Sequence, residues 1–125
     1  MTDRDDAPAA QPNPAALPDG LEPYRRTALF TEVTVPAGLL KDHTTKQGTW
    51  GVIHVSAGQL RYRITDPRRE PSETLLSGNA APGIVEPTIL HHVEPVGPVQ
   101  FYVEFHRAGE RDASAVSGVP VSGPL

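Results

Sequence analysis

Hydrophobic and polar residues alternate with a period of two in two parts of the chain. In Gln59–Thr65, Leu60, Tyr62 and Ile64 alternate with arginines, and in Val99–His106 four apolar residues alternate with four polar or amphipathic ones. Side chains along a strand point to opposite faces in turn, so this period predicts a β-strand with one buried face. Both segments are therefore predicted strands.

Other segments extend this all-β pattern. Thr27–Val35 carries apolar residues on one face, and Trp50–Val55 is rich in β-branched and aromatic residues, so both predict strands. Ala57-Gly58, between Trp50–Val55 and the strand that starts at Gln59, predicts the turn of a hairpin. Ile84–Val85 predicts a short strand that ends at the proline two residues later.

Turn signals separate the predicted strands at intervals of roughly 8–12 residues, which is typical of β-sandwiches and barrels. Asp66-Pro67 and Pro82-Gly83 predict turns. A single turn near Ala37–Asp42 is the helix candidate. Strand order is not visible from a period of two, so the pattern alone leaves sandwich and barrel open.

Composition divides the chain into a core and two tails. Residues 1–18 are acidic and rich in Pro and Ala, and residues 108–125 consist largely of small residues and Pro. Such segments bury too little apolar surface to offset the entropy of ordering, which predicts disordered tails around one domain at residues 19–107. Because so small a core buries a modest fraction of its surface, we also expect a homodimer.

Charge and composition exclude several classes of function. The 125 residues carry a formal net charge of −4, and their basic residues do not cluster as a nucleic-acid-binding surface requires. No apolar run reaches the roughly 20 residues of a membrane span, and the N-terminus lacks the features of a secretory signal. The chain has no cysteine, which excludes disulfides and thiolate metal sites. These features predict a cytoplasmic protein without nucleic-acid or membrane partners.

One group of candidate site residues surrounds His43. Lys46 and Trp50 follow it closely and bring a cation and a large amphipathic ring near the imidazole, while Gly48 and Gly51 flank the tryptophan. Taken alone, a loop histidine is most often a solvated residue. Together, these residues indicate a small-molecule pocket in which Lys46 attracts an anionic ligand.

A second group comprises Glu86, which lies just before the rigid Pro87 turn, and His91 and His92, which follow it. Adjacent strand residues face opposite ways, and His91 shares its parity with the apolar Val93, so His91 is the inward candidate. The alternative is a surface histidine pair on an edge strand.

Histidines with a nearby carboxylate are common ligands of Zn, Fe, Mn or Ni. The predicted metal ligands are His43, His91, Glu86 and His92. Glu104 is a further pocket candidate, although its parity with Tyr102 and His106 also fits a solvated carboxylate. No nucleophile elbow, P-loop or dinucleotide fingerprint is present.

Four segments together resemble the TehB/YeaR-like family of small cupin-like proteins, named through tellurite resistance: Leu17–Thr27, His43–Gly51, Glu86–Pro95 and Phe101–Phe105. The resemblance implies a cupin double-stranded β-helix, a small jelly-roll barrel, with the ligand pocket at its mouth. It also implies departures from the usual cupin site. Lys46 falls where a second histidine is common, and Gly51 takes the place of the motif glutamate. In fused members the domain accompanies a methyltransferase domain, for which 125 residues leave no room.

The resulting functional prediction is a small metal-binding cupin that binds or converts a small molecule or oxyanion, in stress response or in tellurite or nitrosative detoxification. The alternative is a non-catalytic small-molecule-binding or dimerisation module of the cupin fold. Whether the chain is an enzyme stays open at this point.

Overall fold

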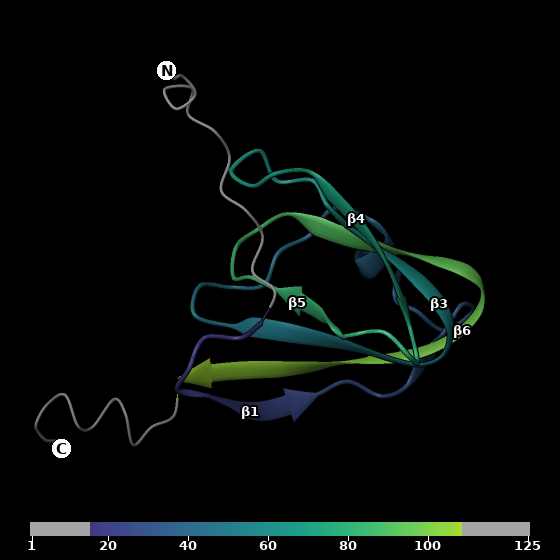
Figure 1. Ribbon diagram of the computed structural model, residues 1–125, viewed down its shortest axis with the longest axis horizontal. Helices are drawn as coiled ribbons and strands as arrows, with labels where there is room; N and C mark the ends of the chain where they lie inside the picture. The colour runs from purple at the N-terminus through teal and green to yellow at the C-terminus, as the bar shows by residue number, and fades with distance from the viewer. Residues whose placement is uncertain (1–15, 109–125) are drawn as a thin grey trace, which may run out of the picture.

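A computed structural model describes residues 16–108, so the predicted tail residues 1–15 and 109–125 lie outside the described part. That part consists of strands, loops and one short 3₁₀ helix, which confirms the predicted all-β class (Figure 1). The elements are β1 (Leu21–Arg26), β2 (Phe30–Thr31), η2 (Ala37–Leu40), β3 (Trp50–Ile64), β4 (Ser72–Ser77), β5 (Gly83–Val85) and β6 (His91–Ala108). Nothing helical in these residues has the length and apolar character needed to cross a membrane.

The two long strands β3 and β6 form the centre of the structure. They pair antiparallel from Trp50 opposite His106 to Ile64 opposite His91. The sheet order is β1-β6-β3-β4, with β2 added to β6 and β5 added to β3. All the other strands are therefore placed by this one pair.

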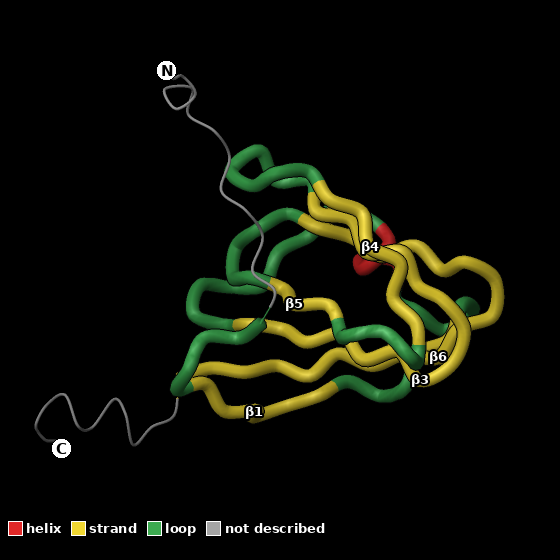
Figure 2. Tube along the Cα trace, in the orientation of Figure 1, coloured by secondary structure: helices red, strands yellow, loops and turns green. Residues whose placement is uncertain are grey.

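The sheet bends across β3 and β6 so that its two ends face each other as layers (Figure 2). One layer holds the first half of β3 and the second half of β6, together with β1, β2 and β5. The other holds the second half of β3, the first half of β6, and β4. The buried apolar side chains lie between the layers: Ile53, Leu60, Tyr62, Ile64, Leu76, Val85, Ile89, Val93, Val99 and Phe101.

The bend falls where a hairpin was predicted. The register of β3 against β6 shifts between Val55 and Ala57 and again after Gly58. Gly58 has a φ of +77°, and a Cβ there would lie 2.0 Å from the carbonyl oxygen of Pro98. The predicted turn at Ala57-Gly58 is wrong, because the glycine serves a bulge between two bending strands and the chain continues in the same strand.

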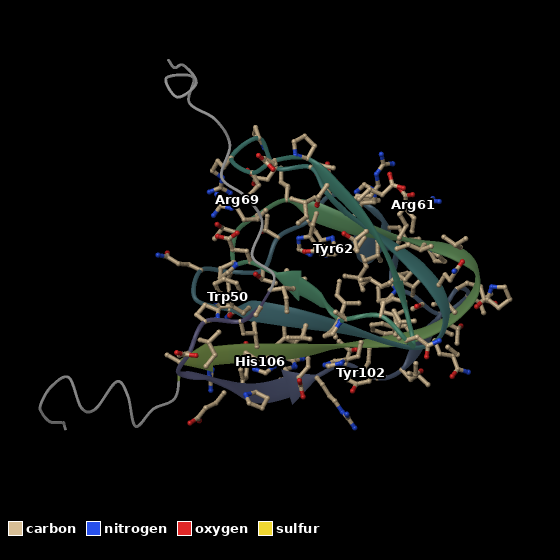
Figure 3. The ribbon with its side chains drawn as sticks, in the orientation of Figure 1. Trp50, Arg61, Tyr62, Arg69, Tyr102 and His106 are labelled. Carbon is tan, nitrogen blue, oxygen red and sulfur yellow. The ribbon has the colours of Figure 1, made fainter. Side chains whose placement is uncertain are left out.

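The extra residue in β3 also changes which positions face inward. Before the bulge the odd-numbered Ile53 packs in the core cluster, with Val52 next to it also buried. After the bulge the even-numbered Leu60 and Tyr62 belong to the core while Arg61 lies outside (Figure 3). A one-residue insertion moves every following side chain to the other face. The alternation predicted for Gln59–Thr65 is confirmed, with its even-numbered side chains inside.

Some predicted elements differ from the structure. Of the predicted strand Thr27–Val35, only β2 is extended, because the hydroxyl of Thr34 accepts a hydrogen bond from the Thr31 amide and the Val35 amide bonds to the Thr31 carbonyl as a turn. β1 and β4 have no predicted counterpart. The turn at Asp66-Pro67, the strand β5 and the single helical turn near Ala37 are confirmed.

Candidate ligand pocket

A cavity of about 400 Å³ lies between the layers, on the side of β1 and of the loop that carries His43. Ligand sites in proteins have volumes of roughly 300–1,000 Å³ and are mostly apolar with a few polar groups. This cavity fits that description. It is lined by Tyr24, Arg25, Thr27, Phe30, Pro36, Leu39, His43, Thr44, Thr45, Lys46, Thr49, Ile53, Val85, His91, Val93, Phe101, Val103 and Phe105.

The pocket contains a pair of histidines that the backbone holds together. The amide of His43 donates to the carbonyl of His91 at 2.9 Å, and the amide of His91 donates to the carbonyl of His43 at 3.0 Å. Their ring centroids lie 4.2 Å apart. Two candidates from separate parts of the sequence are thus joined by an isolated β-bridge.

The same tautomer is fixed on both rings. The Nδ1 of His43 lies 2.8 Å from the Lys41 carbonyl, and the Nδ1 of His91 lies 2.8 Å from the Ile89 carbonyl. A carbonyl only accepts, so each Nδ1 carries the hydrogen and, in a neutral ring, each Nε2 keeps its lone pair. No hydrogen bond within residues 16–108 engages either Nε2. The pocket therefore offers two fixed hydrogen-bond acceptors.

Burial keeps His91 neutral. Its side chain is 3% exposed. Desolvation lowers its pKa to about 4, against the opposing effect of the hydrogen bond to Ile89. Tyr62, whose ring meets His91 edge-on, donates its hydroxyl to the carbonyl of Ile84 at 2.7 Å, and burial raises its pKa. Near neutral pH, His91 is an uncharged acceptor inside the pocket.

His92 lies on the opposite face of β6. Its Nδ1 contacts Asp42 at 2.9 Å and its Nε2 contacts Glu94 at 2.7 Å. Partial burial disfavours its charged form, but the bonds to Glu94 and Asp42 outweigh this and raise the pKa of His92. Parity thus separated the two neighbours as expected, and both ring nitrogens of His92 have carboxylate partners outside the pocket.

Glu86 does not meet the histidine pair. The Arg69 guanidinium donates two hydrogen bonds to the Glu86 carboxylate, one of them from Nε to Oε1 at 2.7 Å. A bidentate arginine occupies the oxygens that a metal would need. Glu86 is therefore part of a structural ion pair and does not line the pocket.

Trp50 and Glu104 also lie outside the pocket lining, whereas Lys46 is part of it. Glu104 faces the outside of the β3–β6 pair, where its Oε1 lies 3.1 Å from His106 Nε2 and 3.5 Å from His54 Nε2. Burial opposes ionisation of Glu104, yet the two imidazoles lower its pKa. Figure 3 shows Trp50, Tyr102 and His106 along this same stretch of sheet.

Several pocket residues have no counterpart among the predicted ones. Arg25 lines the pocket because it pairs directly with Phe105, after a bulge in β1 beside Tyr24. That bulge breaks the alternation of β1, which hid both the strand and the inward position of Arg25. Phe101 and Phe105 are among the alternating apolar residues of Val99–His106, for which a buried face was predicted.

Fold and pocket together define a small all-β domain with an apolar ligand cavity. Residues 25–103 match the family described as "TehB-like domain". The chain therefore belongs to the TehB-like domain family, which confirms the resemblance seen in its motifs.

One curated relative is a probable S-adenosyl-L-methionine-dependent methyltransferase, TehB from Haemophilus influenzae. It is 31% identical over 72 residues, which are 57% of this chain and 25% of the relative. The chain thus spans about a quarter of the curated relative that it matches.

Two solved structures share the fold. The crystal structure of TehB from H. influenzae superposes with a TM-score of 0.67 and 23% identity, over 81% of this chain and 36% of that one. A protein from E. coli K12 superposes with a TM-score of 0.67 and 24% identity, over 76% of this chain and 98% of that one. These similarities establish the shared fold.

The function predicted from the sequence, a metal-binding cupin for detoxification, is wrong. The curated relative is named as a methyltransferase. Residues 16–108 hold no group of three or more His, Cys, Asp or Glu side chains placed to bind a metal. The physical reason is that Arg69 occupies Glu86 and that His92 faces away. Neither the predicted function nor its alternative included a link to methyl transfer.

Proposed function

We propose that this chain is the small-molecule-binding domain of a TehB-type, S-adenosylmethionine-dependent methyl-transfer system, and that its pocket receives the molecule to be methylated. The observation that carries the proposal is the cavity of about 400 Å³ with apolar walls and two fixed imidazole acceptors. The family membership and the methyltransferase relative support the link to methyl transfer.

The pocket does not fit S-adenosylmethionine itself. That cofactor carries a positive sulfonium and a positive ammonium group beside its one carboxylate, and the two cations need carboxylates or other negatively polarised acceptors near them. Arg25 and Lys46 line the pocket, and none of the Asp and Glu residues between positions 16 and 108 does. The proposed division of labour therefore leaves the cofactor to a methyltransferase and the methyl acceptor to this domain.

A chimera tests the proposal. In H. influenzae TehB, the segment that matches residues 25–103 is replaced by those residues, and formation of S-adenosylhomocysteine is measured against the parent enzyme. The chimera is expected to keep turnover. A chimera that folds, as judged by circular dichroism, but no longer turns over would contradict the proposal.

A pocket-filling variant sharpens this test. Thr44 is exposed and lines the pocket, whereas Gln47, in the same loop, is exposed and does not. In the chimera, Thr44→Trp is expected to raise the KM for the methyl acceptor about tenfold and leave the KM for S-adenosylmethionine unchanged. Gln47→Trp is the matched control and is expected to change neither constant.

Three earlier expectations stay predictions within this proposal: a small-molecule or anionic ligand, a homodimer, and a cytoplasmic location. The cupin-type jelly roll is also a prediction, which the closure of one bent sheet into two layers around a pocket supports. Size-exclusion chromatography with light scattering measures the oligomeric state directly.

A further inference from the structure

The pocket is lined by two cations that form no ion pair with a described residue. Within residues 16–108, every arginine other than Arg25 either pairs with a carboxylate or lies over a tyrosine ring. Lys46 and Lys41 likewise form no ion pair with a described residue. Of these three residues, Arg25 and Lys46 line the pocket and Lys41 does not, in a protein whose net charge is negative.

Polarity changes with depth in this pocket. Arg25 and Lys46 are exposed, so they lie toward its mouth, while His91 and Phe101 are buried and form its floor. The walls between them are apolar and include Phe30, which meets Phe101 edge-to-face with a centroid distance of 5.6 Å. From the mouth inward, the pocket therefore presents positive charge, then aromatic walls, and finally a neutral hydrogen-bond acceptor at its floor.

We propose that the ligand is an amphipathic organic acid: a carboxylate that lies at Arg25 and Lys46, an aromatic or aliphatic body against the phenylalanines, and a hydroxyl or amino group that donates to His91 Nε2. This inference rests on the proposed function, whose substrate class it names. A bare inorganic anion would leave the apolar walls uncovered and forgo most of the available burial energy. A cation would be repelled at the mouth.

Binding of matched probes to the full chain tests the charge requirement by calorimetry near neutral pH. The probes are 4-hydroxybenzoate, its neutral methyl ester, the cation tyramine, and inorganic phosphate. We expect 4-hydroxybenzoate to bind at least about tenfold more tightly than the ester, and tyramine and phosphate to show no binding. Equal binding of the ester or tyramine, binding of phosphate alone, or no binding of any probe up to about 10 mM would each overturn the inference.

Two comparisons locate the carboxylate and the donor. Arg25→Gln and Lys46→Gln are each expected to weaken 4-hydroxybenzoate binding about 3- to 10-fold. Lys41→Gln, which removes an exposed charge outside the pocket lining, is the control and is expected to leave binding unchanged. Benzoate, which lacks the hydroxyl, is expected to bind more weakly than 4-hydroxybenzoate by a similar factor. An equal loss in the Lys41 variant, or a stronger binding of benzoate, would contradict the assigned orientation.

The two proposals fail separately. Probe binding to the chain decides the ligand class without any methyl transfer, and turnover of the TehB chimera decides the role in methyl transfer without any of these probes. An inactive chimera with the expected charge preference would overturn the methyl-transfer role and leave the ligand class standing. An active chimera without that charge preference would overturn the ligand class and leave the methyl-transfer role standing.

Discussion

The two faces of the β3–β6 pair place the same kind of side chain in different environments. The adjacent residues His91 and His92 show the difference. His91, on the inner face, is buried, keeps one nitrogen on a backbone carbonyl and has a pKa lowered to about 4. His92, on the outer face, contacts two carboxylates and has a raised pKa. The inner face therefore carries His91 as an uncharged hydrogen-bond acceptor, and the outer face carries His92 paired with carboxylates.

The difference shows that a residue's environment in this fold is set by which side of the sheet it faces. Outer-face arginines Arg61 and Arg63 share Glu73 and Glu94 in exposed ion pairs. Inner-face positions of the same strands hold packed apolar residues and the pocket. Desolvated groups occur on both faces, since His106 on the outer face is also buried, but the cavity lies on the inner face.

The largest test of this comparison concerns Phe101 and Tyr102, adjacent aromatic residues on opposite faces. Phe101 is fully buried, whereas Tyr102 is half-buried, stacked on His54 and covered by Arg26. Phe101→Ala is expected to lower the free energy of unfolding by about 3–5 kcal/mol, and Tyr102→Ala by about 1–2 kcal/mol. Urea denaturation measures both, and equal losses would break the comparison.

The bend that brings the layers together provides the next test. Gly58 and Gly97 both have positive φ, but only Gly58 is crowded, while a Cβ at Gly97 would meet open space. Gly58→Ala is expected to cost about 2–5 kcal/mol through combined backbone strain and overpacking. Gly97→Ala is expected to cost about 1–2 kcal/mol through strain alone. Thermal unfolding of both variants checks this, and similar losses would show that crowding at Pro98 is unimportant.

The histidine neighbours predict opposite pH dependences. The unfolded chain protonates His91 near pH 6.5, while the folded chain resists protonation until about pH 4. Stability from this neutral histidine is therefore complete above pH 6.5 and is lost, by about 3 kcal/mol, as the pH falls to 4. His92 has a raised pKa, so its contribution is complete below pH 6.5 and is lost as the pH rises through that raised value.

Unfolding free energies measured across this pH range separate the two histidines. His91→Gln is expected to flatten the loss of stability on the acidic side, and His92→Gln to flatten the loss on the neutral side. A His91→Gln variant that keeps the full acidic loss would mean that other groups carry it.

The smallest expected effect belongs to the outer face. Arg61 lies 2.8 Å from Glu73 and 3.3 Å from Glu94, but its side chain is 37% exposed. Because solvent screens exposed pairs, Arg61→Gln is expected to lower the free energy of unfolding by about 1 kcal/mol or less. Urea denaturation at low and high salt checks this, and a larger or salt-independent loss would assign the ion pairs a greater role.

Alternation was the sequence signal that carried furthest. It predicted the inward residues of Gln59–Thr65 and the opposite faces of His91 and His92, because a strand has one fixed side-chain period. It failed at Gly58, since a glycine with positive φ serves a hairpin and a bulge equally well. It also failed in β1, where a bulge beside Tyr24 interrupts the period.

The candidate site was only partly predictable for a similar reason. His43 and His91 could be named from their surroundings, but not the β-bridge that joins them. The partner of Glu86 is Arg69, 17 residues away, and their contact depends on the turn at Asp66. Contacts of this kind come from the path of the chain between strands, which residue patterns do not encode.

The pairing of β3 with β6 also sets the order in which the protein can assemble. Its nearest partners, Ile64 and His91, are 27 residues apart, and its farthest, Trp50 and His106, are 56 apart. Domains dominated by such distant contacts fold on the millisecond-to-second scale, because a long loop must close before any contact is gained. The end of this pairing that closes the shorter loop, Ile64 with His91, carries the two imidazoles and can form first. The Phe105 and β1 side of the cavity depends on the long-range end, so the cavity is completed late in folding and disappears early when the central strands separate.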